Sequence, residues 1–359
     1  MKNIFSASGA MAAIGVACMA MYLARTIPPL AKCIAGTCPT ISGKDALFGS
    51  VLYLVKPDQT GYSWTDLENF AAIRKTHAMF LRSIGRLLEL FESPSHAVTV
   101  VKREIPGTAN NGQTPVTVYI LQRKSSDENK TKKKPLVLIY HGGGTVLGEA
   151  EDPIAHKIAS SSGAVVVAPE YRLAPDHPYP AGVEDCYTAL LWSVEHADEL
   201  GIDTNRVSVS GVSAGGLMAA SVAIMAKNRR GPTLKSQYLG NMMGTPLVTE
   251  SKVKFWDDHG GLTAKEIQWF WQMYVGADAS SCIEDERCSP LANKDFSGLP
   301  EAVISVGLHD ILLSEGLQYA EKLRNAGVKV HLLTQRGSHY CLAFESNIEQ
   351  VISTWLPLL

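Results

Sequence analysis

The chain has almost no excess of charge of either sign. Its 359 residues include 33 Lys and Arg against 35 Asp and Glu, which leaves a net charge of −2. Nucleic-acid binding usually requires a basic surface, so this balance gives no electrostatic case for such a partner. The densest basic run, Lys132–Lys134, follows the polar stretch Ser125–Lys130. We interpret it as a solvated hairpin loop.

Several motifs of cofactor-binding proteins are also missing. The sequence contains no G-x-x-x-x-G-K-[ST] and no G-x-G-x-x-G, and neither H-E-x-x-H nor paired C-x-x-C. A nucleotide role and a metal site are therefore not indicated, and we expect no cofactor. Internal repeats and low-complexity tracts are absent as well. The length favours one α/β domain with an appended cap over two equal domains.

A long run without charge lies at the N-terminus. Ile4–Ala24 contains no charged residue and is long enough to span a bilayer as a helix, although Ala, Gly and Ser make it only moderately apolar. We expect residues 1–25 to form a membrane anchor or a signal peptide, with Cys18 and Ala20 as small residues at a cleavage site. A buried helix of the folded domain is the remaining alternative.

Seven cysteines, an odd number, are present. The pairs Cys33 with Cys38 and Cys282 with Cys288 are spaced closely enough to close short loops in an oxidising compartment. Reduced cysteines that serve as small apolar residues are an equal alternative. Asn129 begins the single N-x-S/T sequon and is the expected glycosylation site if the domain is lumenal.

Strand and helix patterns predict an α/β fold with a mostly parallel sheet. Residues 26–95 contain a linker-like stretch and then helical spacing, which indicates N-terminal cap helices. Val98–Ile105 and Val116–Leu121 alternate like an antiparallel pair. The strands expected after them are Leu136–Tyr140, Ala164–Ala168, Arg206–Ser210, Leu239–Gly244, Ala302–Val306 and Val328–Leu333. The helices expected between and after them are Pro153–Ser161, Gly182–His196, Ala214–Lys227, Glu315–Asn325 and Leu342–Trp355.

This alternation of strands and helices predicts a central sheet with helices on both faces, in a catalytic domain of residues 96–359. One connection is unusually long. It covers about residues 249–289 and includes the aromatic run Trp269–Tyr274. We expect it to form a helical cap over the edge of the sheet where a ligand would bind.

Two glycine-rich motifs each follow a predicted strand. His141–Gly144 reads H-G-G-G, and Gly211–Gly215 reads G-V-S-A-G. A G-x-S-x-G turn between a strand and a helix holds its serine on a sharp bend with the hydroxyl exposed. A glycine-rich loop after an earlier strand can aim backbone N–H groups at the oxyanion that forms on attack by that serine. Together the motifs predict a serine hydrolase with Ser213 as nucleophile.

The base and the acid are expected at the ends of later strands. His339 follows the last predicted strand and precedes the final helix, where an imidazole would overhang the serine. Asp310 follows the preceding strand and is the expected partner that orients His339. Glu315 is expected to open the next helix instead. His141 is expected to anchor the glycine-rich loop.

Backbone N–H groups of Gly142, Gly143 and Ala214 are the expected oxyanion donors, since they belong to the glycine-rich loop and to the helix after the nucleophile. The aromatic residues of the cap suggest an apolar acyl or aryl substrate, with core packing within the cap as the competing interpretation. They are Trp269, Phe270, Trp271 and Tyr274, and three of them are the expected substrate contacts: Trp269, Trp271 and Tyr274.

With these residues placed, the chain resembles the hormone-sensitive-lipase family of α/β-hydrolases from about Val98 to the C-terminus. The resemblance rests on both glycine motifs, on Tyr171–Pro175 (YRLAP) with His177–Ala181 (HPYPA), and on Ser289–Leu291. It implies the α/β-hydrolase fold with a helical cap, a small-molecule ester substrate and hydrolysis of esters or amides through an acyl-enzyme. A non-catalytic, receptor-like binding protein is the alternative, against which the retention of His339 argues.

The N-terminal apolar segment followed by a helical cap is similar to the arylacetamide deacetylase and neutral cholesterol ester hydrolase branch. That similarity implies a role in lipid metabolism and a single-pass type II protein of the endoplasmic reticulum membrane with a lumenal catalytic domain. Secretion after signal cleavage is the alternative. Two departures from the family pattern concern substrate scope and rate. Val212 replaces the usual Asp before the serine, and Gly307–Gly316 (GLHDILLSEG) lacks the usual Pro and second Asp.

Overall fold

A computed structural model of the chain describes residues 98–123, 133–151, 153–247, 262–276, 280–335, 339 and 345–359. The expected N-terminal anchor (1–25), the segment 26–95 and Asn129 lie outside the described residues, as does part of the expected cap insertion. Among the helices within the described ranges, none combines the length and the apolar character that crossing a bilayer requires.

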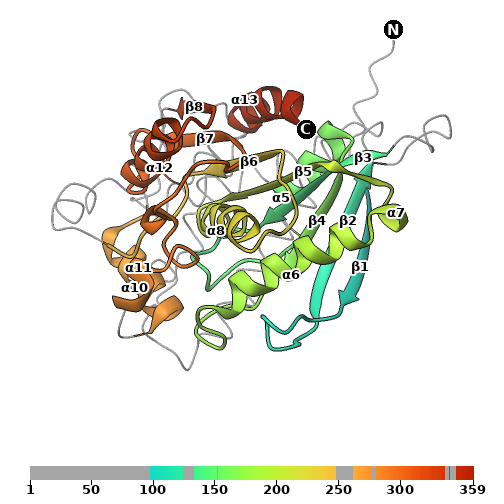
Figure 1. Cartoon of the computed structure of the whole chain (residues 1–359). Helices are drawn as coiled ribbons and strands as arrows, with labels where there is room; N and C mark the ends of the chain where they lie inside the picture. Colours follow the sequence, from blue (N-terminus) through green and yellow to red (C-terminus); the bar gives the residue numbers. More distant parts are fainter. Residues whose placement is uncertain are drawn as a thin grey trace, which may run out of the picture. The chain divides into compact units, whose positions relative to one another are not determined.

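The described strands form one eight-stranded sheet in the order β1-β2-β4-β3-β5-β6-β7-β8 (Figure 1). β2 pairs antiparallel with both β1 and β4, and the other neighbours are parallel. The antiparallel pair and the largely parallel sheet are as predicted. The strands are β1 (Val98–Ile105), β2 (Val116–Arg123), β3 (Lys134–Tyr140), β4 (Val165–Glu170), β5 (Ile202–Val212), β6 (Ser236–Gly240), β7 (Glu301–Gly307) and β8 (Val330–Gln335).

Helices cover both faces of this sheet, and Figure 1 shows α6 and α8 on one of them. On the opposite face, α5 and α13 contribute to one apolar cluster with the strands. The helices are α5 (Pro153–Ser162), α6 (Ala181–Glu195), α7 (Ala197–Leu200), α8 (Ala214–Asn228), α10 (Ala264–Val275), α11 (Ser280–Glu284), α12 (Leu313–Asn325) and α13 (Glu345–Trp355), with short 3-10 turns η3 (Pro290–Ala292) and η5 (Leu356–Leu358).

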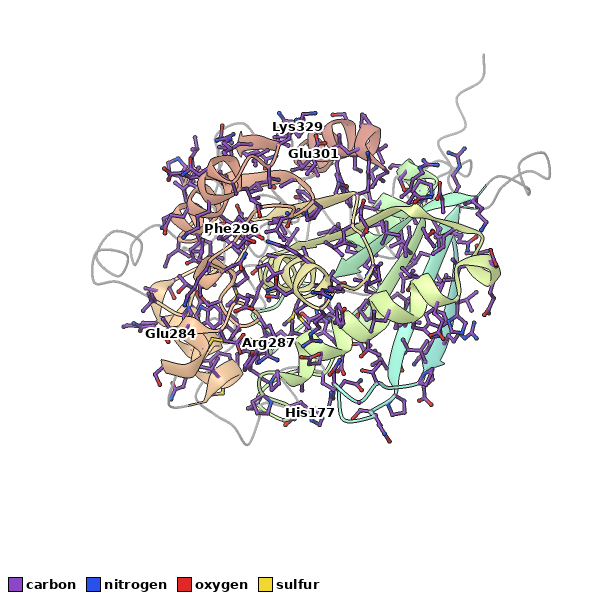
Figure 2. All side chains as sticks on the ribbon, in the orientation of Figure 1. His177, Glu284, Arg287, Phe296, Glu301 and Lys329 are labelled. Atoms are coloured by element: carbon purple, nitrogen blue, oxygen red, sulfur yellow. A yellow bond between two sulfur atoms is a disulfide. The ribbon has the colours of Figure 1, made fainter. Side chains whose placement is uncertain are left out.

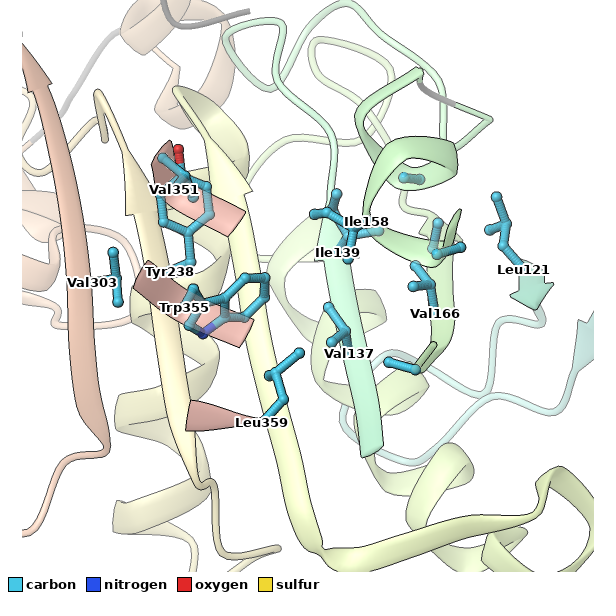
Figure 3. Close-up of a cluster of buried hydrophobic side chains, with 14 of the residues drawn as sticks. Leu121, Val137, Ile139, Ile158, Val166, Tyr238, Val303, Val351, Trp355 and Leu359 are labelled. Carbon is cyan, nitrogen blue, oxygen red and sulfur yellow. The ribbon is translucent and has the colours of Figure 1, made fainter. Parts of the chain in front are cut away.

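The core on the α5 and α13 face is built from the β-branched and aromatic residues of the strands (Figure 3). Strands buried on both faces read as continuous apolar runs, and LVLIY in β3 is such a run. Trp355 at the end of α13 is fully buried against Tyr238, and its indole N–H donates to Ser236 Oγ at 2.8 Å. This contact fixes the C-terminal helix, and so one end of the connection that carries His339, on the sheet.

One strand boundary differs from its prediction in a way that matters for the site. The apolar pattern predicts a strand over Leu239–Gly244, but β6 ends at Gly240. Asn241 takes a φ of +38°, a left-handed conformation that a strand cannot contain. The four residues after Gly240 therefore leave the sheet at its carboxyl edge, where parallel strands present binding residues.

Candidate active site

Ser213 occupies a sharp turn between β5 and α8. Its backbone has φ 60° and ψ −120°, a strained conformation for a residue with a side chain. The turn packs closely against the end of β3, because a Cβ on Gly215 would overlap the carbonyl of Tyr140. Glycine is therefore required at this position. The Ser213 N–H donates to the Gly240 carbonyl at 2.8 Å, which ties the turn to β6. The sequence motif therefore folds into the strand–turn–helix that presents Ser213 at the sheet edge.

Asp310 and His339 come together at the same edge, although 29 positions separate them in sequence. His339 Nδ1 donates to Asp310 Oδ2 at 2.8 Å, and Asp310 is 1% exposed. The other carboxylate oxygen accepts the Leu312 N–H at 2.9 Å, which fixes the orientation of the group. The bond between His339 Nδ1 and Asp310 sets the tautomer of the imidazole and leaves Nε2 as the nitrogen that can exchange a proton with a hydroxyl.

Two of the expected oxyanion donors, Gly142 and Ala214, adjoin Ser213. The position that a Cβ would take on Gly142 is 3.7 Å from Cβ of Ser213, so the glycine-rich loop runs directly beside the turn. Ala214 is the first residue of α8, where a backbone N–H has no partner within the helix and the helix dipole favours negative charge. Gly143 continues the loop with a φ of +110°.

His141 supports this loop rather than reacting. Its ring stacks on Tyr171 with centroids 4.2 Å apart, and Nδ1 donates to the Gly142 carbonyl at 2.8 Å. Burial lowers the pKa of His141 to about 4, against the opposing effect of that hydrogen bond, so the ring is neutral at pH 7. The Ala174 N–H donates to the Thr145 carbonyl at 3.0 Å. The segment Tyr171–Pro175 (YRLAP), which the sequence indicated only through a family resemblance, thus packs against the glycine-rich loop and holds it in place.

Helix α10 brings the aromatic residues of the cap to the glycine-rich loop. It begins at a complete capping box between Thr263 and Glu266. A Cβ on Gly144, whose φ is +63°, would overlap the ring of Phe270, so this side chain lies against the loop. The three aromatic residues singled out for substrate contact lie on the same helix and are at most 9% exposed: Trp269, Trp271 and Tyr274.

A disulfide joins Cys282 of α11 to Cys288 and closes a short segment at the end of that helix. Inside it, Asp285 accepts the Tyr179 hydroxyl at 2.6 Å. Arg287 pairs with Glu184 of α6 at 3.3 Å, on the side of the segment that faces that helix (Figure 2). Burial raises the pKa of Tyr179 well above its usual range, and the bond to Asp285 adds to this. These contacts attach the segment after the cap helices to the body of the domain. The spacing of the cysteines alone is compatible with both a disulfide and reduced thiols.

Two further residues, Val212 and Glu315, lie near the site. Val212 is half-buried and, with Ile154 and Ile158, lines a small apolar cavity on the α5 side of the turn. Glu315 opens α12 as expected, but it is also buried and accepts the Gly244 N–H at 2.5 Å.

A family profile described as the α/β hydrolase fold matches residues 137–343, more than half of the chain. The chain belongs to this family. The predicted α/β-hydrolase fold is confirmed, and the chain order of the three residues, Ser213, Asp310 and His339, is the order that α/β hydrolases use.

Individual relatives of this α/β hydrolase carry esterase names. Carboxylesterase NlhH of Mycobacterium tuberculosis is 41% identical over 203 residues, which are 55% of this chain and 63% of that protein. Carboxylic ester hydrolase LipN of the same organism is 36% identical over 253 residues, 68% of this chain and 65% of LipN. Each match thus spans less than two thirds of the relative's own length. The solved structure of a bacterial heroin esterase has a TM-score of 0.72 at 26% identity and covers 85% of this chain and 95% of that one.

Proposed function

We propose that this α/β hydrolase is a carboxylic ester hydrolase that works through an acyl-enzyme on Ser213. The observation that carries the proposal is the bond between His339 and Asp310, at the sheet edge where the strained turn presents Ser213. A receptor-like protein has no need of an oriented imidazole at this place, so the retained pair bears against the non-catalytic alternative. The names of the mycobacterial relatives support ester chemistry.

In the proposed reaction His339 Nε2 takes the hydroxyl proton of Ser213 as the oxygen attacks the acyl carbon. Asp310 holds the imidazole in place and stabilises the imidazolium that forms. The same proton then passes to the leaving alcohol. Water, activated by His339 in the second half, cleaves the acyl-enzyme and returns Ser213 to its starting state.

The negative charge on the former carbonyl oxygen would be stabilised by backbone N–H groups of Gly142, Gly143 and Ala214. Each such donor contributes about 3 kcal/mol to stabilisation of the transition state in related sites. The position of Gly142 beside Ser213 and the place of Ala214 at the helix N-terminus support this assignment.

We also propose that the substrate carries an apolar acyl or aryl group, with an ester or an amide as the bond that is cleaved. The support comes from α10, whose Phe270 lies against Gly144 of the glycine-rich loop. Trp269 packs edge-on against Phe270 with centroids 5.3 Å apart and extends this aromatic surface. Trp271 and Tyr274, on the same helix, remain proposed substrate contacts.

Hydrolysis of p-nitrophenyl butyrate by the full-length protein tests the proposal. We expect Ser213→Ala to lower kcat at least about a thousandfold and to abolish labelling by a fluorophosphonate probe. The matched control is Ser221→Ala, which changes a buried serine of α8 and should leave both readouts at the wild-type level. Unchanged hydrolysis in Ser213→Ala would refute the nucleophile. No labelling of the folded wild-type protein would favour a receptor.

We also propose that the protein belongs to the arylacetamide deacetylase-like branch and is anchored in the endoplasmic reticulum membrane. Residues 1–25 would form a type II anchor and residues 26–95 a linker and cap helices. Residues 96–359 would form a lumenal catalytic domain. The uncharged stretch Ile4–Ala24 supports the anchor. The Cys282–Cys288 disulfide supports an oxidising compartment, where Asn129 would carry a glycan. Carbonate extraction that releases full-length, folded protein from membranes would contradict the anchor, and N-terminal sequencing would reveal signal cleavage and secretion.

A further inference from the structure

The segment that follows β6 contacts the elements that carry all three candidate catalytic residues. Gly240, the last residue of β6, accepts the N–H of Ser213, and the Met243 N–H donates to the Ser213 carbonyl at 3.2 Å. The Asn241 N–H donates to Ser305 on β7 at 2.9 Å, five positions before Asp310. Residues 240–244 thus lie between the nucleophile turn and the strand that leads to the acid.

Asn241 uses both ends of its side chain in this position, where it is 1% exposed. Its Oδ1 accepts the Gly307 N–H at 2.8 Å, and its Nδ2 donates to the His339 carbonyl at 3.3 Å. Gly307 in turn accepts the Asp310 N–H at 3.1 Å, and Asp310 accepts His339 Nδ1. These four hydrogen bonds form a closed ring that runs from Asn241 through the acid to the base and back.

We propose that Asn241 is a positioning residue that fixes the positions of His339 and Asp310 relative to each other. This inference rests on the proposed ester hydrolysis. An amide is suited to the task because it carries a donor and an acceptor, one for each neighbouring backbone group. Asparagine is also among the few non-glycine residues that tolerate a φ of +38°. The buried ring costs little conformational entropy on substrate binding, since it is already formed.

Asn241→Gly tests the role of the side chain without disturbing the backbone conformation. Glycine adopts the left-handed conformation without strain and lacks both hydrogen-bonding groups of the amide. We expect kcat for p-nitrophenyl butyrate to fall about 10- to 100-fold, as a displaced base loses proton-transfer efficiency. KM should stay within about twofold, because Asn241 is 1% exposed and therefore not accessible to a bound substrate. The rate of fluorophosphonate labelling of Ser213 should fall in parallel with kcat.

Asn111→Gly is the matched control. Asn111 is 4% exposed, accepts the Thr108 N–H at 2.8 Å and donates to the Thr114 carbonyl at 2.7 Å, as Asn241 does with its two backbone partners, and it also donates to Asp185 Oδ1 at 3.0 Å. Asn111→Gly therefore loses both backbone hydrogen bonds and one more, and none of them involves Ser213, Asp310 or His339. We expect a similar fall in Tm from both variants and a wild-type kcat in Asn111→Gly alone.

The outcomes separate this inference from the function on which it rests. A folded Asn241→Gly protein with wild-type kcat, or with a raised KM and unchanged kcat, overturns the positioning role while Ser213→Ala still establishes hydrolysis. If Asn241→Gly does not fold, Asn241→Asp decides by the same criteria, because the carboxylate keeps the acceptor for Gly307 and loses the donor to His339. A wild-type protein that neither hydrolyses nor labels refutes the proposed function and this inference together.

Discussion

Stability at acid pH should depend on the buried His141. The unfolded chain binds a proton at this ring near pH 6.5, whereas the folded protein does not until about pH 4. Between these values the unfolded state holds more protons, so the free energy of unfolding falls as the pH drops from 6.5 to 4. Below pH 4 the ring adds no further change, and above pH 6.5 its full contribution is present.

The size of this effect follows from the fall in pKa from 6.5 to about 4. Each tenfold difference in proton affinity between the folded and unfolded states corresponds to about 1.4 kcal/mol, so His141 accounts for about 3 kcal/mol between pH 6.5 and 4. Because the ring is 4% exposed and stacked on Tyr171, solvent does not screen it in the folded state.

His141→Phe removes the titrating group and keeps a flat ring against Tyr171. At pH 7 the variant should be about 1 kcal/mol less stable than the wild type, since the hydrogen bond to the Gly142 carbonyl is lost. At pH 4 the order should reverse, with the variant more stable by about 2 kcal/mol.

Urea unfolding followed by circular dichroism at pH 7, 6, 5 and 4 measures both curves. His177→Phe, at an exposed position, is the control and should track the wild type at every pH. A constant difference between His141→Phe and the wild type across this range would show that His141 is not held neutral by burial. The glycine-rich loop would then not be packed around a neutral imidazole.

Three further predictions concern the cap. Gly144→Ala should lower kcat/KM about 10- to 100-fold, because its Cβ overlaps Phe270 at a φ of +63°, and the double variant with Phe270→Ala should recover part of the loss. Phe270→Ala alone should raise kcat/KM for p-nitrophenyl octanoate relative to the acetate about tenfold, and an unchanged ratio contradicts contact with substrate. Replacing Cys282 and Cys288 by serine should reduce the free energy of unfolding by about 2 kcal/mol in urea titrations, since the closed loop is short.

Spacing along the chain was enough to predict where Ser213, Asp310 and His339 lie. Each follows a strand of a parallel sheet, and the carboxyl ends of such strands share one edge. Local chemistry also predicts the turn at Ser213, because a short glycine motif between an apolar strand and a helix has few other conformations. Both inferences use only neighbours in sequence and the period of strands and helices.

Asn241 carried no such signal. Its apolar neighbours predicted a strand to Gly244, and its two side-chain partners are 66 and 98 positions away. Tyr179 and Asp285, 106 positions apart, are a second case.

The sequence by itself therefore determined the α/β fold and the identity of the candidate nucleophile, acid and base, because these depend on local conformation and on strand order. Only the tertiary structure decided which side chains hold them, since hydrogen bonds between distant segments form where strand ends meet and leave no periodic pattern in the chain. The ring from Asn241 through Gly307 and Asp310 to His339 exists only once β6, β7 and β8 lie side by side.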